Sequence, residues 1–310
     1  MRSLSLESLD KPWSVITFGC WQIAPSGGWG DYCTPQDADT SVKAALDGGI
    51  TAFDTAEGYG DGESERRLGK ALGSKKNDVL IISKIWPDAD LTLASYQERL
   101  EGTLRALARD FVDVYLVHWP GGFFNTPDKS KKLVDIMTAL RDSGKAKTVG
   151  LSNFETDDLA RFGDHLSEFV VNQVAYNLLE REYESQGLEL CQNAGVGTMV
   201  YSPSARGLLG GRLKADSPTR QQYEVYQEPL FSHSREVLKT VETIAEEANT
   251  QPINVALAWV LSRPNVVTAV VGSKKPEQIK QFCRAGDLEL STEQLSRLTA
   301  ASDAFHTHKS

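Results

Sequence analysis

Eight short apolar runs alternate with longer amphipathic stretches from Val15 to Gln281, and this alternation constrains the fold more than any other feature of the sequence. Apolar runs separated by stretches of helical periodicity are typical of parallel β-strands joined by helical crossovers. The expected strands begin at Val15, Ile50, Val79, Phe111, Ala146, Phe169, Val196 and Val266. The clearest expected helices span residues 36–47, 64–72, 92–108, 131–143 and 156–164.

The number of repeats separates two α/β architectures. Eight β/α units of roughly 30 residues predict a closed (β/α)8 barrel, or TIM barrel. Residues 1–310 would form this barrel as one domain, although two smaller domains also fit the length. An open doubly wound sheet usually carries a Gly-rich turn after its first strand. No G-x-G-x-x-G follows an expected strand here, and the nearest imitation, GYGDG at Gly58–Gly62, has the wrong spacing. A Rossmann dehydrogenase is therefore disfavoured.

Two irregularities interrupt the repeat near the C-terminus. Residues 203–228 form a long polar segment punctuated by Gly and Pro, and segments of this kind are usually functional or disordered. Two helices rather than one are expected between the seventh and eighth strands, over residues 229–248 and 252–262. A last helix over residues 292–300 is expected outside the barrel repeat.

Charge and hydropathy exclude several classes of function. The 310 residues carry a net charge of -9, from 42 acidic and 33 basic side chains spread along the chain. A nucleic-acid partner is not expected, because no basic stripe or tail is present. The N-terminus lacks the apolar core of a signal peptide, and no stretch of about 18 apolar residues occurs. We expect a soluble, cytoplasmic protein without a membrane association.

The four cysteines, Cys20, Cys33, Cys191 and Cys283, have no C-x-x-C spacing. Neither a disulfide framework nor a zinc knuckle is indicated, and buried thiols are the expected state. The five histidines do not cluster, so no metal site is predicted. A serine hydrolase is disfavoured too, because no G-x-S-x-G turn appears.

Unusual polar residues stand where the second, third and fourth expected strands end. Asp54, Lys84 and His118 close these strands, and Tyr59 follows Asp54 by five residues in a Gly-flanked loop. Barrel enzymes place their reactive groups at these strand ends. Taken singly, each residue also has a plainer interpretation. Asp54 would fit a helix cap, Lys84 a solvated ammonium, and His118 a histidine bonded to a backbone carbonyl.

Together, these four residues suit the reduction of a carbonyl group. Hydride transfer to a carbonyl creates an alkoxide that must be protonated as it forms. Tyr59 is a weak acid with an ordinary pKa of about 10, and an ammonium at Lys84 would lower that pKa by favouring the phenolate. Asp54 would compensate the charge of Lys84, and His118 would donate a hydrogen bond that orients the substrate oxygen.

Five segments are similar to those of one known family. They are FDTAEGYGDGESERRLGKAL from Phe53, KIWP from Lys84, YLVHWP from Tyr115, GLSNF from Gly150 and NQVAYNLLER from Asn172. On these segments the chain resembles the aldo-keto reductases, in the branch of bacterial and plant members that is similar to the potassium-channel β subunits. The resemblance covers almost the whole chain and implies that Asp54, Tyr59, Lys84 and His118 form the catalytic tetrad.

The resemblance also implies that NADPH or NADP+ binds in the barrel mouth, with NADH less favoured. Ser152, Asn153 and Gln173 would hold the carboxamide of the nicotinamide, and Tyr201 would stack on its ring. The segment 203–228 would cover the cofactor, and GSKKPEQI from Gly272 would bind the 2′-phosphate end through Lys274, Lys275 and Gln278. The other expected cofactor contacts are Trp21, Ser202, Pro203, Ser204, Arg206, Gly207, Leu208, Gly210, Arg212, Gly272 and Ser273.

Some positions depart from the pattern of the family. Cys20 stands where many relatives have Thr, Ser204 where they usually have Leu, and Phe282 where an Asn commonly contacts adenine. Trp21, Trp86 and Trp119 follow expected strands, and we expect them to form an apolar wall for the substrate. Pocket shape should also depend on the loops after the first, fourth and seventh strands and on the C-terminal tail.

Three functions fit these observations. The first is an NADPH-dependent reductase that acts as a monomer on small aldehydes or ketones, with Tyr59 as general acid. The second is a cofactor-binding regulatory protein similar to the channel β subunits. The third is a sugar or polyol dehydrogenase that works in the oxidative direction, since the tetrad catalyses both directions.

Overall fold

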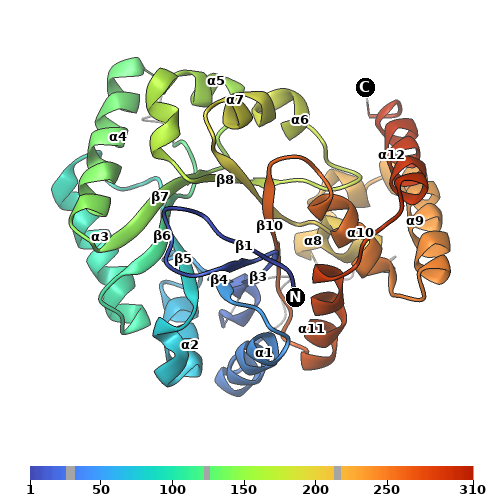
Figure 1. The fold of residues 1–310 in the computed structure, drawn as a ribbon, viewed down its shortest axis with the longest axis horizontal. Coiled ribbons are helices and arrows are strands. Elements are labelled where there is room, and N and C mark those ends of the chain that lie inside the picture. Colours follow the sequence, from blue (N-terminus) through green and yellow to red (C-terminus); the bar gives the residue numbers. More distant parts are fainter. Residues whose placement is uncertain (26–31, 122–125, 213–217, 310) are drawn as a thin grey trace.

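The computed structural model describes residues 1–25, 32–121, 126–212 and 218–309. Eight parallel strands form a closed barrel in which the last strand pairs with the first, as Figure 1 shows. The eight expected strands and the (β/α)8 fold are thus confirmed. The strands are β3 (Ile16–Gly19), β4 (Ala52–Asp54), β5 (Leu80–Ile85), β6 (Val112–Val117), β7 (Ala146–Ser152), β8 (Val171–Ala175), β9 (Gly197–Tyr201) and β10 (Val266–Val271).

The helices surround the barrel and begin at local signals in the sequence. Helix α1 starts with Pro35 after a reciprocal capping box between Thr34 and Asp37. Helix α12 starts with a similar box between Ser291 and Gln294. The α-helices are α1 (Pro35–Asp47), α2 (Glu63–Leu72), α3 (Leu93–Leu107), α4 (Pro127–Asp142), α5 (Thr156–Ala160), α6 (Tyr183–Gln186), α7 (Leu188–Asn193), α8 (Pro218–Gln221), α9 (Leu230–Glu247), α10 (Pro252–Leu261), α11 (Pro276–Cys283) and α12 (Thr292–His306).

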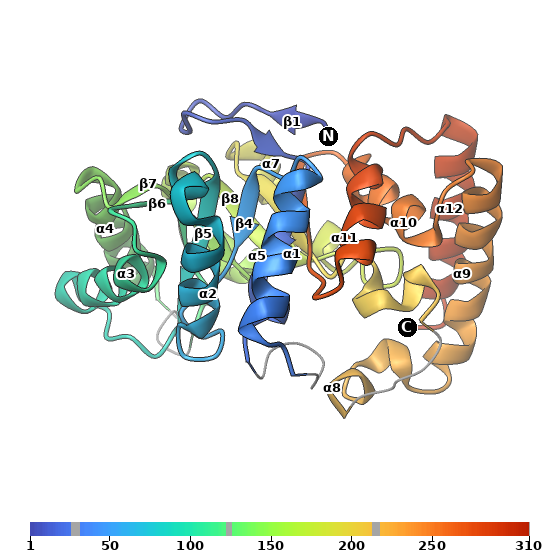
Figure 2. The same cartoon turned by 90° about the horizontal axis from the view of Figure 1, so that it is seen from below.

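The extra helices near the C-terminus are confirmed. Helices α9 and α10 both lie between β9 and β10, and α12 lies beside α9 at the outer edge of the molecule (Figures 1 and 2). Helix α12 runs six residues beyond the expected end at Ala300, because Leu298, Ser302 and Phe305 continue its buried face. Helix α5 is shorter than expected, since it ends at Ala160 and a 3-10 turn follows (Gly163–Glu168).

An N-terminal hairpin, absent from the expected elements, covers the end of the barrel where the strands begin. Its strands are β1 (Ser3–Leu4) and β2 (Trp13–Ser14), and Figure 2 shows it lying across that end. Trp13 is fully buried, and its indole N–H donates to Thr17 Oγ1 at 2.8 Å. Two strands of two residues each are too short for periodicity to reveal them.

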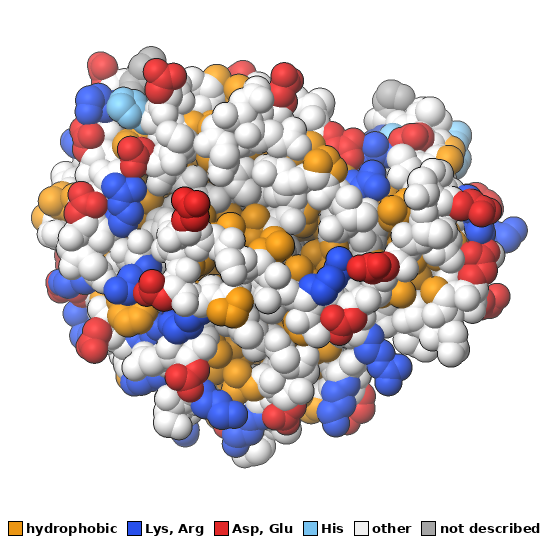
Figure 3. Space-filling view, viewed as in Figure 1, with side chains coloured by type: hydrophobic (Ala, Val, Ile, Leu, Met, Phe, Trp, Pro, Cys, Tyr) orange, Lys and Arg blue, Asp and Glu red, His pale blue; other side chains and the backbone are white. Residues whose placement is uncertain are grey.

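The core has two apolar layers separated by the barrel wall. The smaller layer fills the barrel and includes Ala52, Leu80, Leu116 and Met199, whereas the larger one packs between the strands and the helices. The four cysteines are buried and free, as expected. No helix in the described part of the chain has both the length and the apolar character needed to span a bilayer. Acidic and basic side chains are interspersed on the face seen in Figure 3.

Candidate active site

The alternation of side chains along each strand directs the polar residues into the barrel. Successive side chains of a strand point to opposite faces. On β5, Leu80 and Ile82 belong to the apolar layer inside the barrel, so Lys84 two residues later continues on that face. The same step of two leads from Ala52 to Asp54 on β4. The polar residues therefore occupy the last interior level of the barrel.

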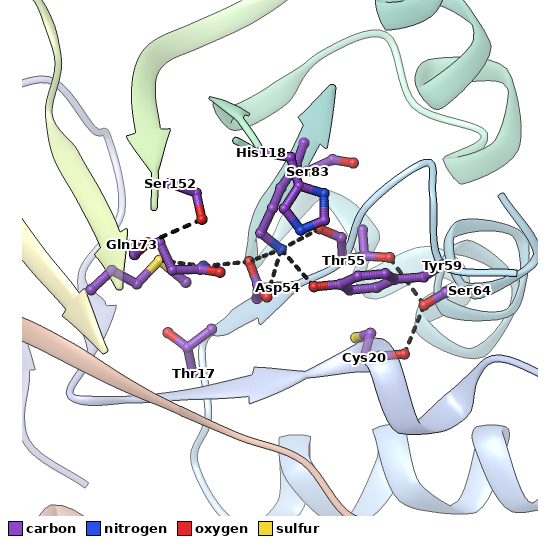
Figure 4. Close-up of polar contacts among 12 residues, drawn as sticks. Thr17, Cys20, Asp54, Thr55, Tyr59, Ser64, Ser83, His118, Ser152 and Gln173 are labelled. Carbon is purple, nitrogen blue, oxygen red and sulfur yellow. Dashed lines mark hydrogen bonds and ion pairs between the residues drawn. The ribbon is translucent and has the colours of Figure 1, made fainter. Parts of the chain in front are cut away.

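Lys84 is the centre of the tetrad. Its side chain is fully buried, and its Nζ lies 2.8 Å from both carboxylate oxygens of Asp54. The ammonium also donates to the carbonyl oxygen of Thr55 at 2.8 Å and to Tyr59 Oη at 3.2 Å (Figure 4). The expected Asp54–Lys84–Tyr59 arrangement is thus present in the structure, and each N–H of the ammonium has an acceptor.

A short chain of hydrogen bonds supports the Thr55 carbonyl from behind. Thr55 Oγ1 donates to Ser64 Oγ at 3.0 Å, and Ser64 Oγ donates to the carbonyl oxygen of Cys20 at 2.8 Å (Figure 4). These contacts join the ends of β3 and β4 to helix α2. They hold in place one of the acceptors that orient Lys84.

Burial and charge act on the tetrad in opposite directions. Burial alone would lower the pKa of Lys84, but the attraction of Asp54 and Tyr59 outweighs it and raises that pKa, so the ammonium persists. Burial raises the pKa of Tyr59, and the charge of Lys84 opposes this rise without overcoming it. The expected lowering effect of Lys84 on the pKa of Tyr59 is present, but desolvation is the larger influence and leaves that pKa above its ordinary value.

His118 is held as a neutral imidazole beside the phenol. Burial, reinforced by the charge of Lys84, lowers its pKa to about 2. Its ring lies edge-on to Trp86 and Tyr59, with centroid distances of 5.0 Å and 5.7 Å. A neutral imidazole carries one N–H, so His118 can donate to an oxygen without adding a second positive charge.

Four residues predicted to contact the nicotinamide are linked to one another and to the tetrad. Tyr201 Oη donates to Asn153 Oδ1 at 2.9 Å, and Asn153 Nδ2 donates to Ser152 Oγ at 3.1 Å. Gln173 Nε2 donates to Asp54 Oδ1 at 2.9 Å, and its carbonyl oxygen accepts from Ser152 Oγ at 3.0 Å. These contacts form a continuous polar floor that includes the carboxylate of Asp54.

One cavity of about 960 Å³ brings most of the predicted residues together. Lys84 does not line it, because its ammonium is enclosed behind Tyr59. The predicted residues that do line it are Trp21, Asp54, Tyr59, Trp86, His118, Trp119, Ser152, Asn153, Gln173, Tyr201, Ser202, Pro203, Ser204, Arg206, Gly207, Gly210, Arg212, Gly272, Ser273, Lys274, Lys275 and Gln278.

Two expectations about the cavity need correction. Leu208 does not line it, because the 3-10 turn Ala205–Gly210 directs this side chain into the apolar core, where it is 1% exposed. The C-terminal tail does not contribute either: among the described residues that line the cavity, none follows Phe282. Helix α12 packs against α9 instead, away from the site.

Several cavity residues were not anticipated from the sequence. Tyr223 lies under the guanidinium of Arg206 at 3.7 Å from the ring centroid, and Arg220 Nε donates to the carbonyl oxygen of Arg206 at 3.3 Å. These residues belong to the expected cofactor-covering segment 203–228, of which residues 213–217 lie outside the described part. Such contacts leave no periodic signal in a polar loop. The other unanticipated residues include Gln22, Ile253 and Gln281.

The far end of the cavity is lined by the segment that follows β10. Ser273 Oγ donates to Gln278 Oε1 at 2.6 Å and accepts from the N–H of Lys275 at 3.0 Å. Lys274 Nζ donates to the carbonyl oxygen of Tyr32 at 3.1 Å. Phe282 also lines the cavity, although only 1% of its surface is exposed.

Comparisons with known proteins match the chain to one family along most of its length. The model of the aldo/keto reductase family matches residues 15–303. An aldo-keto reductase of Bacillus subtilis is 31% identical over 298 residues, which cover 90% of this chain and 87% of the relative. An NADH-specific methylglyoxal reductase of Escherichia coli is 25% identical, with 94% of this chain and 95% of the relative covered.

Solved structures show the same architecture. An aldo/keto reductase of Klebsiella pneumoniae in complex with NADP and acetate superposes with a TM-score of 0.75 at 28% identity, covering 93% of this chain and 91% of the other. A glycerol dehydrogenase of Gluconobacter oxydans superposes with a TM-score of 0.84 at 26% identity, covering 99% of this chain and 95% of the other.

Proposed function

Because the chain belongs to the aldo-keto reductase family of oxidoreductases, we propose that it reduces aldehydes or ketones to alcohols with a nicotinamide cofactor. The contact of the buried Lys84 ammonium with Tyr59 Oη, beside a neutral His118, is the observation that carries this proposal. It combines an acid, a group that stabilises its conjugate base and a neutral hydrogen-bond donor at one end of a large cavity.

The residues around the cavity fit a nicotinamide dinucleotide. Near Tyr59, the amides of Asn153 and Gln173 can hold a carboxamide, and Tyr201 offers a flat ring for stacking. At the other end, Lys274 and Lys275 supply positive charge for phosphate groups. Bound there, the cofactor would supply the hydride for the carbonyl carbon.

Tyr59 supplies the proton in this proposal. The O–H bond of Tyr59 breaks as the new O–H bond of the alcohol forms, and the negative charge left on Oη faces Lys84 Nζ at 3.2 Å. Asp54 keeps Lys84 protonated, so the ammonium is in place before the proton moves. His118 would donate to the same substrate oxygen and direct it toward Tyr59.

We propose a preference for NADPH over NADH, which the cations after β10 support. Lys274, Lys275 and Gln278 line the cavity, and a 2′-phosphate would gain from the charge of both lysines. The similar protein from Klebsiella pneumoniae was crystallised with NADP, whereas the relative from Escherichia coli is specific for NADH. The cofactor preference is therefore a proposal of its own, and it is tested with both cofactors.

The aromatic residues near the tetrad favour substrates with an apolar portion. Trp86 and Trp119 line the cavity although 41% and 43% of their surfaces are exposed. Large exposed indoles beside a polar reaction centre are typical of a wall that binds the apolar part of a ligand. Trp21 lines the same cavity, so we propose that these three residues face the substrate.

A screen for cofactor consumption tests the proposal. The oxidation of NADPH and of NADH is followed separately through the absorbance of the reduced nicotinamide at about 340 nm. The substrates are aromatic aldehydes, short dicarbonyls, pyridoxal and aldoses. We expect NADPH oxidation with at least one class of carbonyl. A flat response with all of them would contradict the proposed reductase.

The reverse reaction is the second candidate, because the glycerol dehydrogenase of Gluconobacter oxydans shares the fold over nearly the whole chain. The same tetrad accepts a proton from an alcohol when it works in the oxidative direction. Incubation with NADP+ and a panel of polyols distinguishes the two: a higher kcat/KM for polyols than for any carbonyl would favour the dehydrogenase.

A further inference from the structure

Glu57 connects three segments around the tetrad although its side chain does not line the cavity. It lies in the loop between β4 and α2, between Asp54 and Tyr59 in the sequence. Its N–H donates to the carbonyl oxygen of Lys84 at 3.4 Å, and its carbonyl oxygen accepts from the N–H of Gly62 at 2.7 Å. The second contact closes the loop that carries Tyr59.

The carboxylate of Glu57 also holds the segment after β5. Its Oε1 accepts from the backbone N–H of Trp86 at 2.5 Å. The indole of Trp86 meets His118 edge-on at 5.0 Å and lies over Gly58, where an added Cβ would be 3.4 Å from the ring. Because 41% of its surface is exposed, Trp86 is packed on one side only. The bond to Glu57 therefore restrains its backbone at the point where the substrate wall begins.

Arg99 in α3 fixes the orientation of this carboxylate. Its Nε lies 2.9 Å from Glu57 Oε2 and its Nη2 lies 2.6 Å from Oε1, which is the two-pronged geometry that holds a carboxylate plane most firmly. The side chain of Glu57 is 14% exposed, so solvent screens the pair only in part. Asp88 binds the remaining Nη1 of Arg99 at 2.9 Å and is 65% exposed.

We propose that Glu57, clamped by Arg99, is a positioning residue for carbonyl reduction: its carboxylate ties the loop that carries Tyr59 to the backbone of Trp86 and so sets Trp86 against His118. The proposal rests on the proposed function of the site. Glu57 has no direct part in the reaction in this proposal, because it would act only through the placement of Tyr59 and Trp86.

Three variants test this role. Glu57→Ala removes every side-chain contact, Glu57→Gln keeps an oxygen that can accept the Trp86 N–H, and Asp88→Ala removes only the outer partner of Arg99. For Glu57→Ala we expect kcat to fall about 10- to 100-fold, the effect of a small misplacement of reacting groups, and KM to rise for aromatic aldehydes more than for short dicarbonyls. Glu57→Gln should recover part of both losses, because its oxygen can accept the Trp86 N–H but its NH2 group faces one N–H of Arg99. Asp88→Ala should stay within about twofold of the parent, as an exposed ion pair contributes little.

Two kinetic results would overturn the proposal. One is a kcat for Glu57→Ala within twofold of the Asp88→Ala control. The other is a Glu57→Ala protein that loses cofactor affinity and activity in proportion, without recovery in Glu57→Gln, since that result indicates general structural damage.

A crystal structure of each Glu57 variant gives a readout that needs no turnover. The indole of Trp86 should leave His118 in Glu57→Ala and remain beside it in Glu57→Gln. An indole that keeps its place in both variants would refute the proposal. If the parent protein consumed no cofactor, the proposed function would fail and this comparison would still decide the role of Glu57.

Discussion

The two ends of the cavity are built on different principles. At the end proposed to carry the reaction (the reaction end), Asp54, Lys84 and Gln173 stand on the last interior level of the barrel, and their polar atoms are already paired with one another. At the end proposed to bind the cofactor phosphates (the phosphate end), the lining comes from segments after β9 and β10, where Ser202 and Arg206 adopt left-handed backbone angles of φ 52° and 58°. The reaction end is thus preorganised by regular structure, whereas the phosphate end depends on irregular loops.

This difference has consequences for substitutions. Lys84 and Asp54 are both buried, so removal of one leaves an unpaired charge inside the protein. Lys275 at the phosphate end is exposed, and its charge can be removed with little effect on folding. We therefore expect changes at the reaction end to alter turnover and changes at the phosphate end to alter cofactor affinity.

The largest effect is expected for Tyr59→Phe. Loss of the acid removes a contribution of about 10²- to 10⁴-fold to kcat, while the carboxamide and phosphate contacts remain. The dissociation constant of NADPH, measured by fluorescence titration, should change by less than about twofold, because the Tyr59 hydroxyl contacts Lys84 and not the predicted cofactor residues. A variant that turns over at the parental rate would remove Tyr59 from the mechanism.

Lys84→Met tests the charge behind the phenol. The ammonium lowers the pKa of Tyr59 against the larger opposing effect of burial, so its loss should raise that pKa further. We expect kcat to fall by about 100-fold and the alkaline limb of the kcat profile to move to higher pH. The buried Asp54 would lose its partner, at a cost of about 3–5 kcal/mol of unfolding free energy.

The pH profile is the decisive measurement for Lys84. An alkaline limb that stays in place in Lys84→Met would show that the ammonium does not act on Tyr59. Urea denaturation should be recorded in parallel, so that kcat is compared only for the folded fraction.

The sequence predicted the strand ends of the site well and its loops poorly. Asp54, Lys84 and His118 could be placed together because each lies within one residue of the end of a strand, and the step of two residues along a parallel strand fixes the face. Leu208 and the C-terminal tail were misplaced because loop and tail positions depend on tertiary packing. Arg220 and Tyr223 were missed for the same reason, as no period marks a loop residue that folds back onto a cavity.

Lys274→Ala and Lys275→Ala probe the phosphate end. Each removes a charge that would attract a 2′-phosphate, so KM for NADPH should rise about tenfold per lysine, in line with a charge-assisted hydrogen bond of about 1.5–3 kcal/mol. KM for NADH and the kcat with either cofactor should change little. Lys280→Ala is the matched control, because Lys280 is exposed on helix α11, which begins directly after Lys275, and does not line the cavity. An equal rise of KM for NADPH and NADH would argue against a role in 2′-phosphate recognition.

The smallest effect on catalysis, and the most selective effect on stability, is expected for Glu65→Gln. Glu65 in α2 accepts from Ser83 Oγ at 2.6 Å, on the outer face of β5 opposite Lys84, and burial raises its pKa to about 7. The folded protein therefore holds this carboxyl protonated up to about pH 7, while the unfolded chain releases the proton near the ordinary pKa of 4.5. Its contribution to stability is fully present below pH 4.5 and is lost as the pH rises through about 7, by on the order of 3 kcal/mol.

Glutamine at position 65 cannot ionise. The unfolding free energy of Glu65→Gln relative to the parent should therefore increase as the pH rises from 4.5 to 8. Urea denaturation at both values measures this gain, and a difference between variant and parent that is equal at the two pH values would contradict it. kcat should stay near the parental value, because Glu65 does not line the cavity. That result would separate the two faces of β5. On the inner face, Lys84 is paired with Asp54 and is proposed to act in catalysis, and on the outer face, the buried carboxyl of Glu65, which accepts from Ser83, affects stability alone.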